Sequence, residues 1–265
     1  MSFGKTPSQN GSDRSALQKA LDAALGRGEM DHDPVRADMI SPSEVEQFSL
    51  LPLRMDAAEL VDEVDVLLAR GVSIDTVYVD LLAPAARKLG QFWEQDQCDF
   101  VDVTMGLWRL QEVLHEISAR SAYRPKLLEP SAKRALFLPM PGDQHFLGPQ
   151  VLDDFFARAG WDTSIMTKPR RKEVLDLLSS ESFDVVALTL SRDCPSAALR
   201  NIVKAMRSVS RNEHISILVG GHMINQNPAI VTEVGADGTG TDARAALEVA
   251  EALVRSSKVR AQTLR

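Results

Sequence analysis

The sequence predicts an α/β protein in which an N-terminal four-helix cap precedes a doubly wound parallel-sheet domain. Three features favour this class. Residues 41–123 show only the apolar spacing of amphipathic helices. From residue 134 onward, short apolar runs alternate with helical segments. Those runs are apolar throughout rather than at every second position, as expected of parallel strands that are buried on both faces.

The first 40 residues are rich in Gly, Ser, Asp and Pro. They contain one short amphipathic piece, "SALQKALDAAL" (15–25), in which Leu17, Leu21 and Leu25 share one stripe. This piece predicts a helix that forms transiently or on contact with a partner. We therefore expect residues 1–40 to form a flexible N-terminal tail.

The four helices of the cap, 41–123, have recognisable starts and ends. Ser41 or Ser43 can cap the first helix, and Asp56 can cap the second, which Gly71 ends. The third runs through "SIDTVYVDLLAPAARKLGQFW", where Pro84 predicts a kink. The fourth carries a continuous apolar stripe made of Val103, Leu107, Leu110, Leu114 and Ile117. One apolar stripe on each helix predicts a small bundle.

A basic, proline-bearing linker, 124–133, leads into the second domain, 134–258. The expected strands are 134–140, 162–166, 184–190, 215–221 and a short 236–240. The expected helices are 147–159, 170–181, 196–209, 226–234 and 242–255. Such alternation predicts a flavodoxin-like, doubly wound sheet.

Composition limits the possible functions. The net charge of −7 argues against a protein whose main task is to grip nucleic-acid phosphates. Cys98 and Cys194 are far apart in sequence, which excludes a disulfide framework and a CxxC metal site. The N-terminus lacks the apolar core of a signal peptide, and no apolar run approaches membrane-spanning length. We therefore expect a cytoplasmic protein without a membrane partner.

Small and polar residues follow three of the expected strands. In an open parallel sheet, ligands bind beyond the carboxyl ends of the strands, so these residues share one edge. They are Asp143, His145 and Gly148 after the first strand, Thr189 and Ser191 after the third, and Gly220 and Gly221 after the fourth.

Several familiar ligand sites do not match this edge. The segment "PGDQHFLG" is not the GxGxxG turn of a dinucleotide site, and the chain has no P-loop. The strand ends also lack the clustered acids of a phospho-acceptor receiver. What remains is His145 with Asp143 two residues before it. A metal-bound imidazole commonly donates its other N–H to a carboxylate, which orients the ring. Gly148 would let the backbone pass close to a bulky ligand.

The segments "DQHFLG", "LTLS" and "GG" resemble the cobalamin-binding motif DxHxxG…SxL…GG at comparable spacings. Thr189 stands in place of the motif's Ser and keeps the hydroxyl, whereas Ser191 stands in place of its Leu. The stretch "LLAPAARKLGQFWEQDQCDFVDVTMG" resembles the helical cap that precedes such domains. In chain order and cap, residues 43–255 are most similar to the AerR/PpaA family of cobalamin-dependent photosynthesis-gene antirepressors.

The resemblance implies a role for each residue at the sheet edge. His145 would be the lower axial ligand of cobalt and would displace the cofactor's own benzimidazole. Asp143 would hydrogen-bond the far nitrogen of that ring. The displaced nucleotide tail would run down a channel lined by Gly148, Thr189, Gly220 and Gly221, with Ser191 beside them.

The cap residues refine the expected upper face of the corrin. In related light-sensing regulators that bind adenosylcobalamin, a cap Trp is followed by a Glu-His pair. Trp93 matches the Trp, but Val103 and Thr104 occupy the positions of the pair. We expect Trp93, Thr104 and Trp108 near the corrin. The upper ligand would then be small, such as water or hydroxide, or would come from elsewhere.

The resemblance implies a regulator and not an enzyme. The expected partner is a transcriptional repressor of photosynthesis genes, and DNA is contacted only indirectly. The rival interpretation is a corrinoid methyl carrier of a methyltransferase system, because such carriers share the cap-then-sheet layout. The identity of the co-purifying partner, repressor or methyltransferase, distinguishes the two. A third possibility is an α/β module without a cofactor, which would be colourless.

Overall fold

The structure is a computed structural model that describes residue 19 and residues 39–120, 132–191 and 194–263. The chain divides into two compact units, Met1–Ser121 and Ala122–Arg265. The expected tail and linker fall almost wholly outside the described residues, so both stay predictions. No helix in the described part of the chain is long and apolar enough to cross a membrane.

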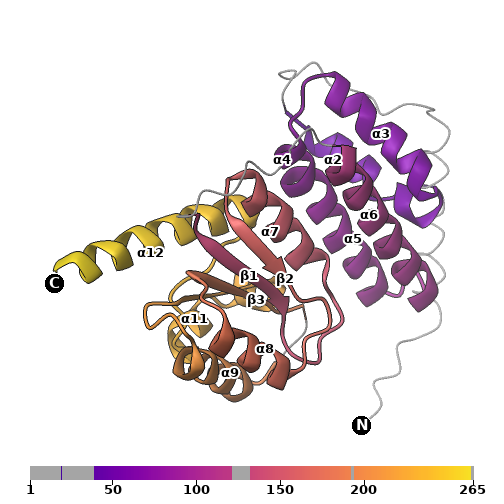
Figure 1. The fold of residues 1–265 in the computed structure, drawn as a ribbon. Helices are drawn as coiled ribbons and strands as arrows, with labels where there is room; N and C mark the ends of the chain where they lie inside the picture. The colour runs from indigo at the N-terminus through magenta and orange to yellow at the C-terminus, as the bar shows by residue number, and fades with distance from the viewer. Residues whose placement is uncertain (1–18, 20–38, 121–131, 192–193, 264–265) are drawn as a thin grey trace, which may run out of the picture. The chain divides into compact units, whose positions relative to one another are not determined.

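The first unit is all helical, as the sequence predicts (Figure 1). Its elements are α2 (Pro42–Phe48), η1 (Leu51–Leu53), α3 (Ala57–Ala69), a run of α4 (Ile74–Thr76), η2 (Val77–Leu82) and α5 (Ala83–Glu94), and α6 (Phe100–Arg120). Gly106 lets α5 approach α6 closely, because a Cβ there would lie 2.9 Å from a methyl carbon of Leu89. The expected stripe on α6 is buried at Val103, Leu110, Leu114 and Ile117.

Helix caps begin the helices of this unit where the sequence places them. The Ser41 side chain accepts a hydrogen bond from the backbone of Glu44, whose carboxylate accepts one from Ser41 in return. Asp56 and Glu59 form the same reciprocal box at the start of α3. Each box satisfies backbone N–H groups that a helix start otherwise leaves unpaired. Gly71, just after α3, has a φ of +103°, which favours glycine.

The expected irregularity at Pro84 lies just before it. The structure has a π-helical stretch, η2, that ends two residues ahead of the proline. A proline ring crowds the carbonyl four residues earlier, which belongs to Asp80 inside η2. The widened π-helical turn therefore includes the carbonyl that the proline ring crowds.

The second unit alternates strands and helices around one parallel sheet with the strand order β2-β1-β3-β4. The strands are β1 (Arg134–Pro139), β2 (Asp162–Ile165), β3 (Val185–Thr189) and β4 (Ser216–Gly220). The helices are α7 (Leu147–Arg158), α8 (Arg171–Ser180), α9 (Ser196–Val209), α10 (His222–Gln226), α11 (Ala229–Val234) and α12 (Ala243–Thr263).

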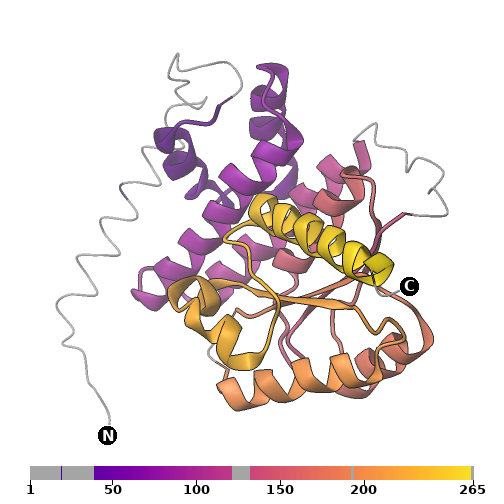
Figure 2. The same cartoon turned by 90° about the vertical axis from the view of Figure 1, so that its left-hand side faces the viewer.

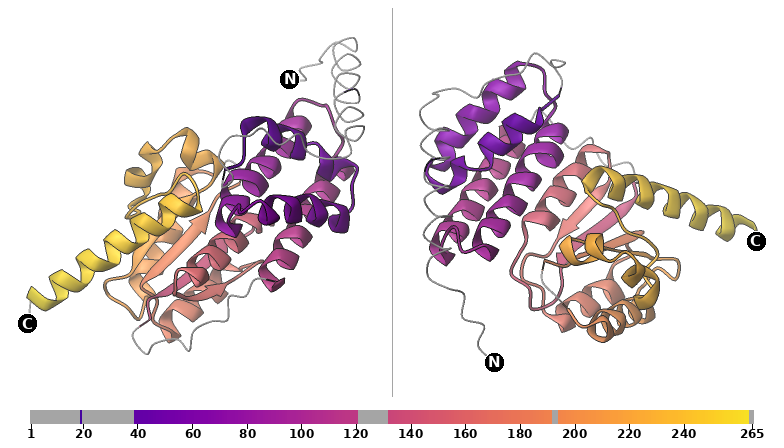
Figure 3. Two further views of the ribbon diagram at one scale, coloured as in Figure 1. Left: turned by 90° about the horizontal axis from the view of Figure 1, so that it is seen from above. Right: turned by 180° about the vertical axis from the view of Figure 1, so that it is seen from behind.

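Both faces of the sheet are covered, which confirms the doubly wound class. α7 and α12 pack on the face that carries Ala135, Phe137 and Ala187. α8, α9 and α11 pack on the opposite face, which carries Leu136 and Leu188. Figure 2 shows α12 and α9 on opposite sides of the strands. Figure 3 shows the C-terminal part of α12 running out past the sheet.

Two sequence predictions were wrong in detail. The expected strand 236–240 is reduced to one bridge, between Leu218 and Gly238. Here the backbone lies against α12: a Cβ on Gly240 would be 2.4 Å from the nitrogen of Ala246. The expected helix 226–234 begins only at Ala229, as α11, because Pro228 precedes it, and the short helix α10 (His222–Gln226) was not predicted.

Candidate functional site

The carboxyl ends of three strands lie level with one another. Thr189 pairs with Pro139 of β1 on one side and with Gly220 of β4 on the other. Backbone hydrogen bonds extend this register: Met140 donates to the Thr189 carbonyl at 2.9 Å, and Leu190 donates to the Gly220 carbonyl at 2.9 Å. The loops that follow these strands therefore begin at the same height on one edge of the sheet.

Asp143 and His145 make the contact that their spacing predicts. The Nδ1 atom of His145 lies 2.6 Å from Oδ1 of Asp143, which also accepts the backbone N–H of His145 at 3.1 Å. Asp143 is buried, with 7 % of its surface exposed, whereas the side chain of His145 is 51 % exposed. A buried carboxylate thus holds an exposed imidazole by Nδ1, which leaves Nε2 as the nitrogen that can bind a metal.

Ser191 has a different part in the site from the one the resemblance implies. Its hydroxyl donates a short hydrogen bond to Oδ2 of Asp143, and its backbone N–H approaches the same oxygen at 3.4 Å. Ser191 therefore positions the carboxylate from the loop after β3. Its hydroxyl is committed to Asp143, and its place beside the channel stays a prediction.

The hydrogen bonds determine the charge state of Asp143. Burial by itself raises the pKa of this carboxyl, but hydrogen bonds from Ser191 and His145 lower it further than burial raises it. The net pKa lies below its usual value, so the carboxylate is ionised at neutral pH. A depressed folded-state pKa stabilises the fold above the ordinary carboxyl pKa, and this stabilisation is lost as the pH falls through the folded value.

Ser191→Ala is expected to raise the pKa of Asp143, because one lowering hydrogen bond is lost while burial remains. The stabilising effect of the ionised carboxylate then disappears at a higher pH than in the wild type. Carboxyl-carbon NMR titration of Asp143 measures this directly, with acid unfolding as the second measurement. Ser208→Ala on α9, whose hydroxyl bonds only the local Ala205 carbonyl, is the matched control. An unchanged Asp143 pKa would contradict the assigned contact.

A row of small residues lies beside this group. A Cβ on Gly148 would be 3.7 Å from the methyl carbon of Thr189, and a Cβ on Gly220 would be 3.8 Å from the carbonyl oxygen of Gly240. Thr189 and Gly220 follow Ala187 and Leu218 by two residues on their strands. They therefore face the α7 and α12 side of the sheet, as those residues do. The predicted channel residues Gly148, Thr189 and Gly220 are thus brought together.

Gly221 has a backbone conformation and a close backbone neighbour that require a glycine. Its φ is +108°, and a Cβ there would lie 2.2 Å from the carbonyl oxygen of Leu190. The space that a side chain would fill already holds the loop after β3. Gly221 therefore lets two strand-end loops touch, and its place in the lining of the channel stays a prediction.

Sequence reasoning missed Gly240 and Thr239. Gly240 contributes its carbonyl opposite Gly220, and Thr239 Oγ1 is buried without a hydrogen-bond partner among the described residues. The signal was present in "GTG" (238–240), since a glycine pair after a strand position indicates close backbone approach.

The cap candidates lie in the first unit. Trp93 and Trp108 are large apolar side chains that are 50 % and 51 % exposed. Thr104 is exposed, but its hydroxyl donates to the Phe100 carbonyl at 2.6 Å one turn earlier. Its proton is therefore used within the helix. Corrin contact by these three residues stays a prediction.

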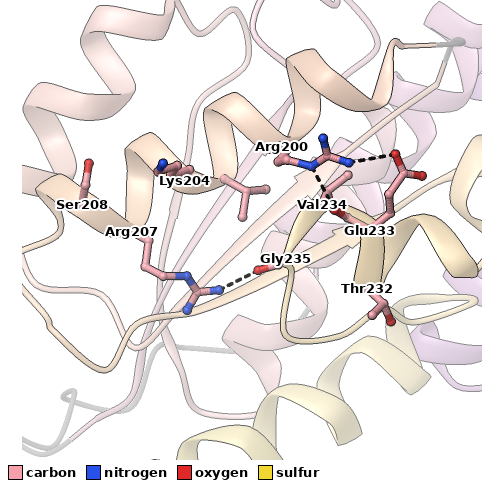
Figure 4. Close-up of a pocket in the computed structure, with 9 residues that line it drawn as sticks. Arg200, Lys204, Arg207, Ser208, Thr232, Glu233, Val234 and Gly235 are labelled. Atoms are coloured by element: carbon pink, nitrogen blue, oxygen red, sulfur yellow. Dashed lines mark hydrogen bonds and ion pairs between the residues drawn. The ribbon is translucent and has the colours of Figure 1, made fainter.

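A surface groove of about 500 Å³ lies elsewhere, between α9 and α11 (Figure 4). Arg200 binds the carbonyl and the carboxylate of Glu233, and Arg207 binds the Gly235 carbonyl and Asp237. Cations at the C-terminal end of a helix stabilise its unpaired carbonyls. These arginines therefore have a structural explanation in the attachment of α11 to α9.

Residues 133–248 match the B12 binding domain family. A 20.5 kDa uncharacterized protein from the bchF-crtJ intergenic region of Rhodobacter capsulatus is 25 % identical over 169 residues, which are 64 % of this chain and 87 % of the relative. The Methanosarcina barkeri monomethylamine corrinoid protein superposes with a TM-score of 0.64 at 13 % identity, over 79 % of this chain and 96 % of that one.

The site fits the cofactor of the matched family. No cluster of three or more His, Cys, Asp or Glu side chains able to hold a metal ion occurs in the described ranges. The edge instead offers one oriented imidazole, which suits a metal already held by a macrocycle. Beside it lie the small residues Gly148 and Gly220 and the Thr239 hydroxyl, which has no hydrogen-bond partner among the described residues and could serve as a polar partner for an attached arm. Residues 133–248 of this chain are a B12 binding domain, and the chain resembles the cobalamin-dependent photosynthesis-gene antirepressors.

Proposed function

We propose that the chain binds cobalamin with His145 as the lower axial ligand and acts as an antirepressor of photosynthesis genes. The observation that carries the first half is the buried Asp143 carboxylate, held by Ser191, which orients an exposed imidazole at the edge of a B12 binding domain. When bound, the cobalt would supply a coordination site whose ligand exchanges in response to light or redox state.

The chain's own residues prepare this ligation. The Asp143 carboxylate accepts a hydrogen bond from Nδ1–H of His145, so the lone pair of Nε2 stays available to bind a metal. Ser191 keeps the carboxylate ionised and in place. Gly148, Thr189 and Gly220 present little bulk along the α7 and α12 face, where the nucleotide arm would lie. Thr239 offers that arm a hydroxyl that lacks a partner in the described structure.

Two observations support the regulatory half. The relative from Rhodobacter capsulatus is encoded in the bchF-crtJ region, among photosynthesis genes. The chain has a net charge of −7, which suits a protein partner better than naked DNA. Exchange of the upper ligand would shift the population of a state that binds the repressor. The protein would then have no catalytic role and would reach DNA only through that partner.

The experiment uses the full chain reconstituted with hydroxocobalamin. We expect a red protein whose spectrum is that of a base-off cobalamin with a histidine imidazole as its lower ligand. It should bind the product of one of the two genes that border the relative's gene in Rhodobacter capsulatus, bchF and crtJ, and release that protein from promoter DNA, with a change in affinity after illumination or reduction. Binding is measured by biolayer interferometry and DNA release by fluorescence anisotropy. Colourless protein would contradict cofactor binding. Co-purification with a methyltransferase and methyl transfer to a thiol would favour the methyl carrier instead.

A further inference from the structure

The groove of about 500 Å³ between α9 and α11 lies on the sheet face opposite to α7 and α12 (Figure 4). It is therefore separate from the face where the nucleotide arm of cobalamin would lie. Its floor is apolar, because Val203 and Val234 line it and each is only 2 % exposed. Small-molecule sites in proteins have volumes of roughly 300–1,000 Å³ and mostly apolar walls with a few polar groups. The groove has the size and the floor of such a site.

The cations of the groove come from one side of α9. Arg200, Lys204 and Arg207 follow one another at intervals of four and three residues, which places them on the same helix face, and α9 contains no Asp or Glu. Arg200 pairs with Glu233 at 3.0 Å, and Arg207 pairs with Asp237 at 2.9 Å. Lys204 is exposed and makes no ion pair or hydrogen bond with the described residues. The groove therefore has one positive charge without a counter-charge.

The groove also offers hydrogen-bond donors without matching acceptors. Arg200 binds Glu233 through Nε and Nη2, which leaves its Nη1 without an acceptor among the described residues. Arg207 uses Nη1 and Nη2, which leaves its Nε. The Thr232 hydroxyl lines the groove as Lys204 does and has no partner in the described structure. Donors from four side chains suit phosphate groups, which carry negative charge and more acceptor oxygens than a carboxylate.

We propose that this groove binds a small molecule that carries phosphate groups, with Lys204 as the charge partner that no other group shares. The Lys204 ammonium would bind the phosphate oxygens, and the unused N–H groups of the two arginines would add hydrogen bonds. Val203 and Val234 would contact the body of the ligand. The site goes beyond the proposed function, because it gives the chain a ligand in addition to cobalamin, on the other side of the sheet.

The test titrates sodium pyrophosphate into the full chain by isothermal titration calorimetry at low ionic strength. We expect saturable binding at one site. Lys204→Met removes the unshared charge, keeps an unbranched side chain that suits a helix, and should weaken binding about tenfold or more. Lys168→Met is the matched control, because Lys168 is also exposed and without an ion-pair partner among the described residues, but lies just before α8 and outside the groove. This control should bind pyrophosphate within about twofold of wild type.

Glu233→Gln changes the charge of the groove in the opposite direction. The Gln amide oxygen can still accept a hydrogen bond from Arg200, but the nine residues that line the groove lose their one carboxylate. Pyrophosphate should therefore bind severalfold more tightly to this variant than to wild type, because a repulsive charge is removed.

Each possible result supports or overturns the inference. Weaker binding by Lys204→Met together with tighter binding by Glu233→Gln supports it. Absence of saturable pyrophosphate binding by the wild type would overturn it, and so would equal weakening by Lys204→Met and Lys168→Met, because the attraction would then belong to the whole surface. An oligoglutamate peptide is titrated in parallel, and tighter binding of that peptide than of pyrophosphate would assign the groove to an acidic protein segment instead.

Discussion

Gly221→Ala is expected to lower the free energy of unfolding by about 3 kcal/mol. A φ of +108° is strained for any residue with a Cβ, at a cost of roughly 1–2 kcal/mol. The new Cβ would also lie 2.2 Å from the Leu190 carbonyl oxygen, and forced backbone movement in a packed region costs about 1–3 kcal/mol more. Urea unfolding followed by circular dichroism measures the change.

Two glycine variants separate the causes. Gly142→Ala carries the strain alone, because φ there is +92° and nothing lies within 4 Å of the new Cβ. Gly220→Ala introduces neither backbone strain nor a close contact, since the nearest atom to its new Cβ would be the Gly240 carbonyl oxygen at 3.8 Å. We expect the loss to be largest for Gly221, about 1–2 kcal/mol for Gly142 and under about 1 kcal/mol for Gly220. Equal stability of the Gly221 and Gly220 variants would refute the contact between the two loops.

His145→Ala is expected to abolish lower axial ligation by the protein. Loss of an outer partner of a metal ligand typically costs 10–100-fold in affinity, so loss of the ligand itself should cost at least that much. The spectrum of any remaining bound cobalamin should then become that of the cofactor free of protein ligation. Absorption spectra during titration with hydroxocobalamin provide both readouts.

His222→Ala is the matched control for the imidazole. His222 also lies just beyond a strand end and is exposed, but its ring contacts Gln226, with 2.7 Å between the two Nε2 atoms. We expect the absorption spectrum of cobalamin bound to His222→Ala to match that of the wild-type protein. The affinity of Asp143→Ala for cobalamin should fall between the affinities of His145→Ala and His222→Ala, because the imidazole stays but loses its orientation. An unchanged spectrum in His145→Ala would refute the proposed lower ligand.

Local sequence signals predicted much of this molecule. The boxes at Ser41 and Asp56 depend on residues three positions apart, and the Asp143–His145 contact spans two. The uniformly apolar runs predicted a parallel sheet, and the strand ends then placed Thr189 and Gly220 at one edge. Each of these inferences needs only the chain's own periodicity and the rules of parallel sheets.

What escaped prediction depends on contacts between distant segments. The hydroxyl of Ser191 reaches Asp143 across 48 residues, and only the pairing of β1 with β3 brings them together. The motif assigned Gly220 and Gly221 one shared role, but only the structure shows that a side chain at Gly221 would meet the Leu190 carbonyl. The lost strand at 236–240 depends on how closely α12 approaches Gly240.

Asp143 also makes the site a mechanical unit. One oxygen of its carboxylate holds the imidazole, and the other holds the loop after β3, whose Leu190 carbonyl rests against Gly221. A displacement of the His145 imidazole therefore reaches the loops after β1, β3 and β4 through these direct contacts. The loops cannot separate one at a time without breaking a buried ionic hydrogen bond, so this edge of the sheet stiffens or loosens as a whole.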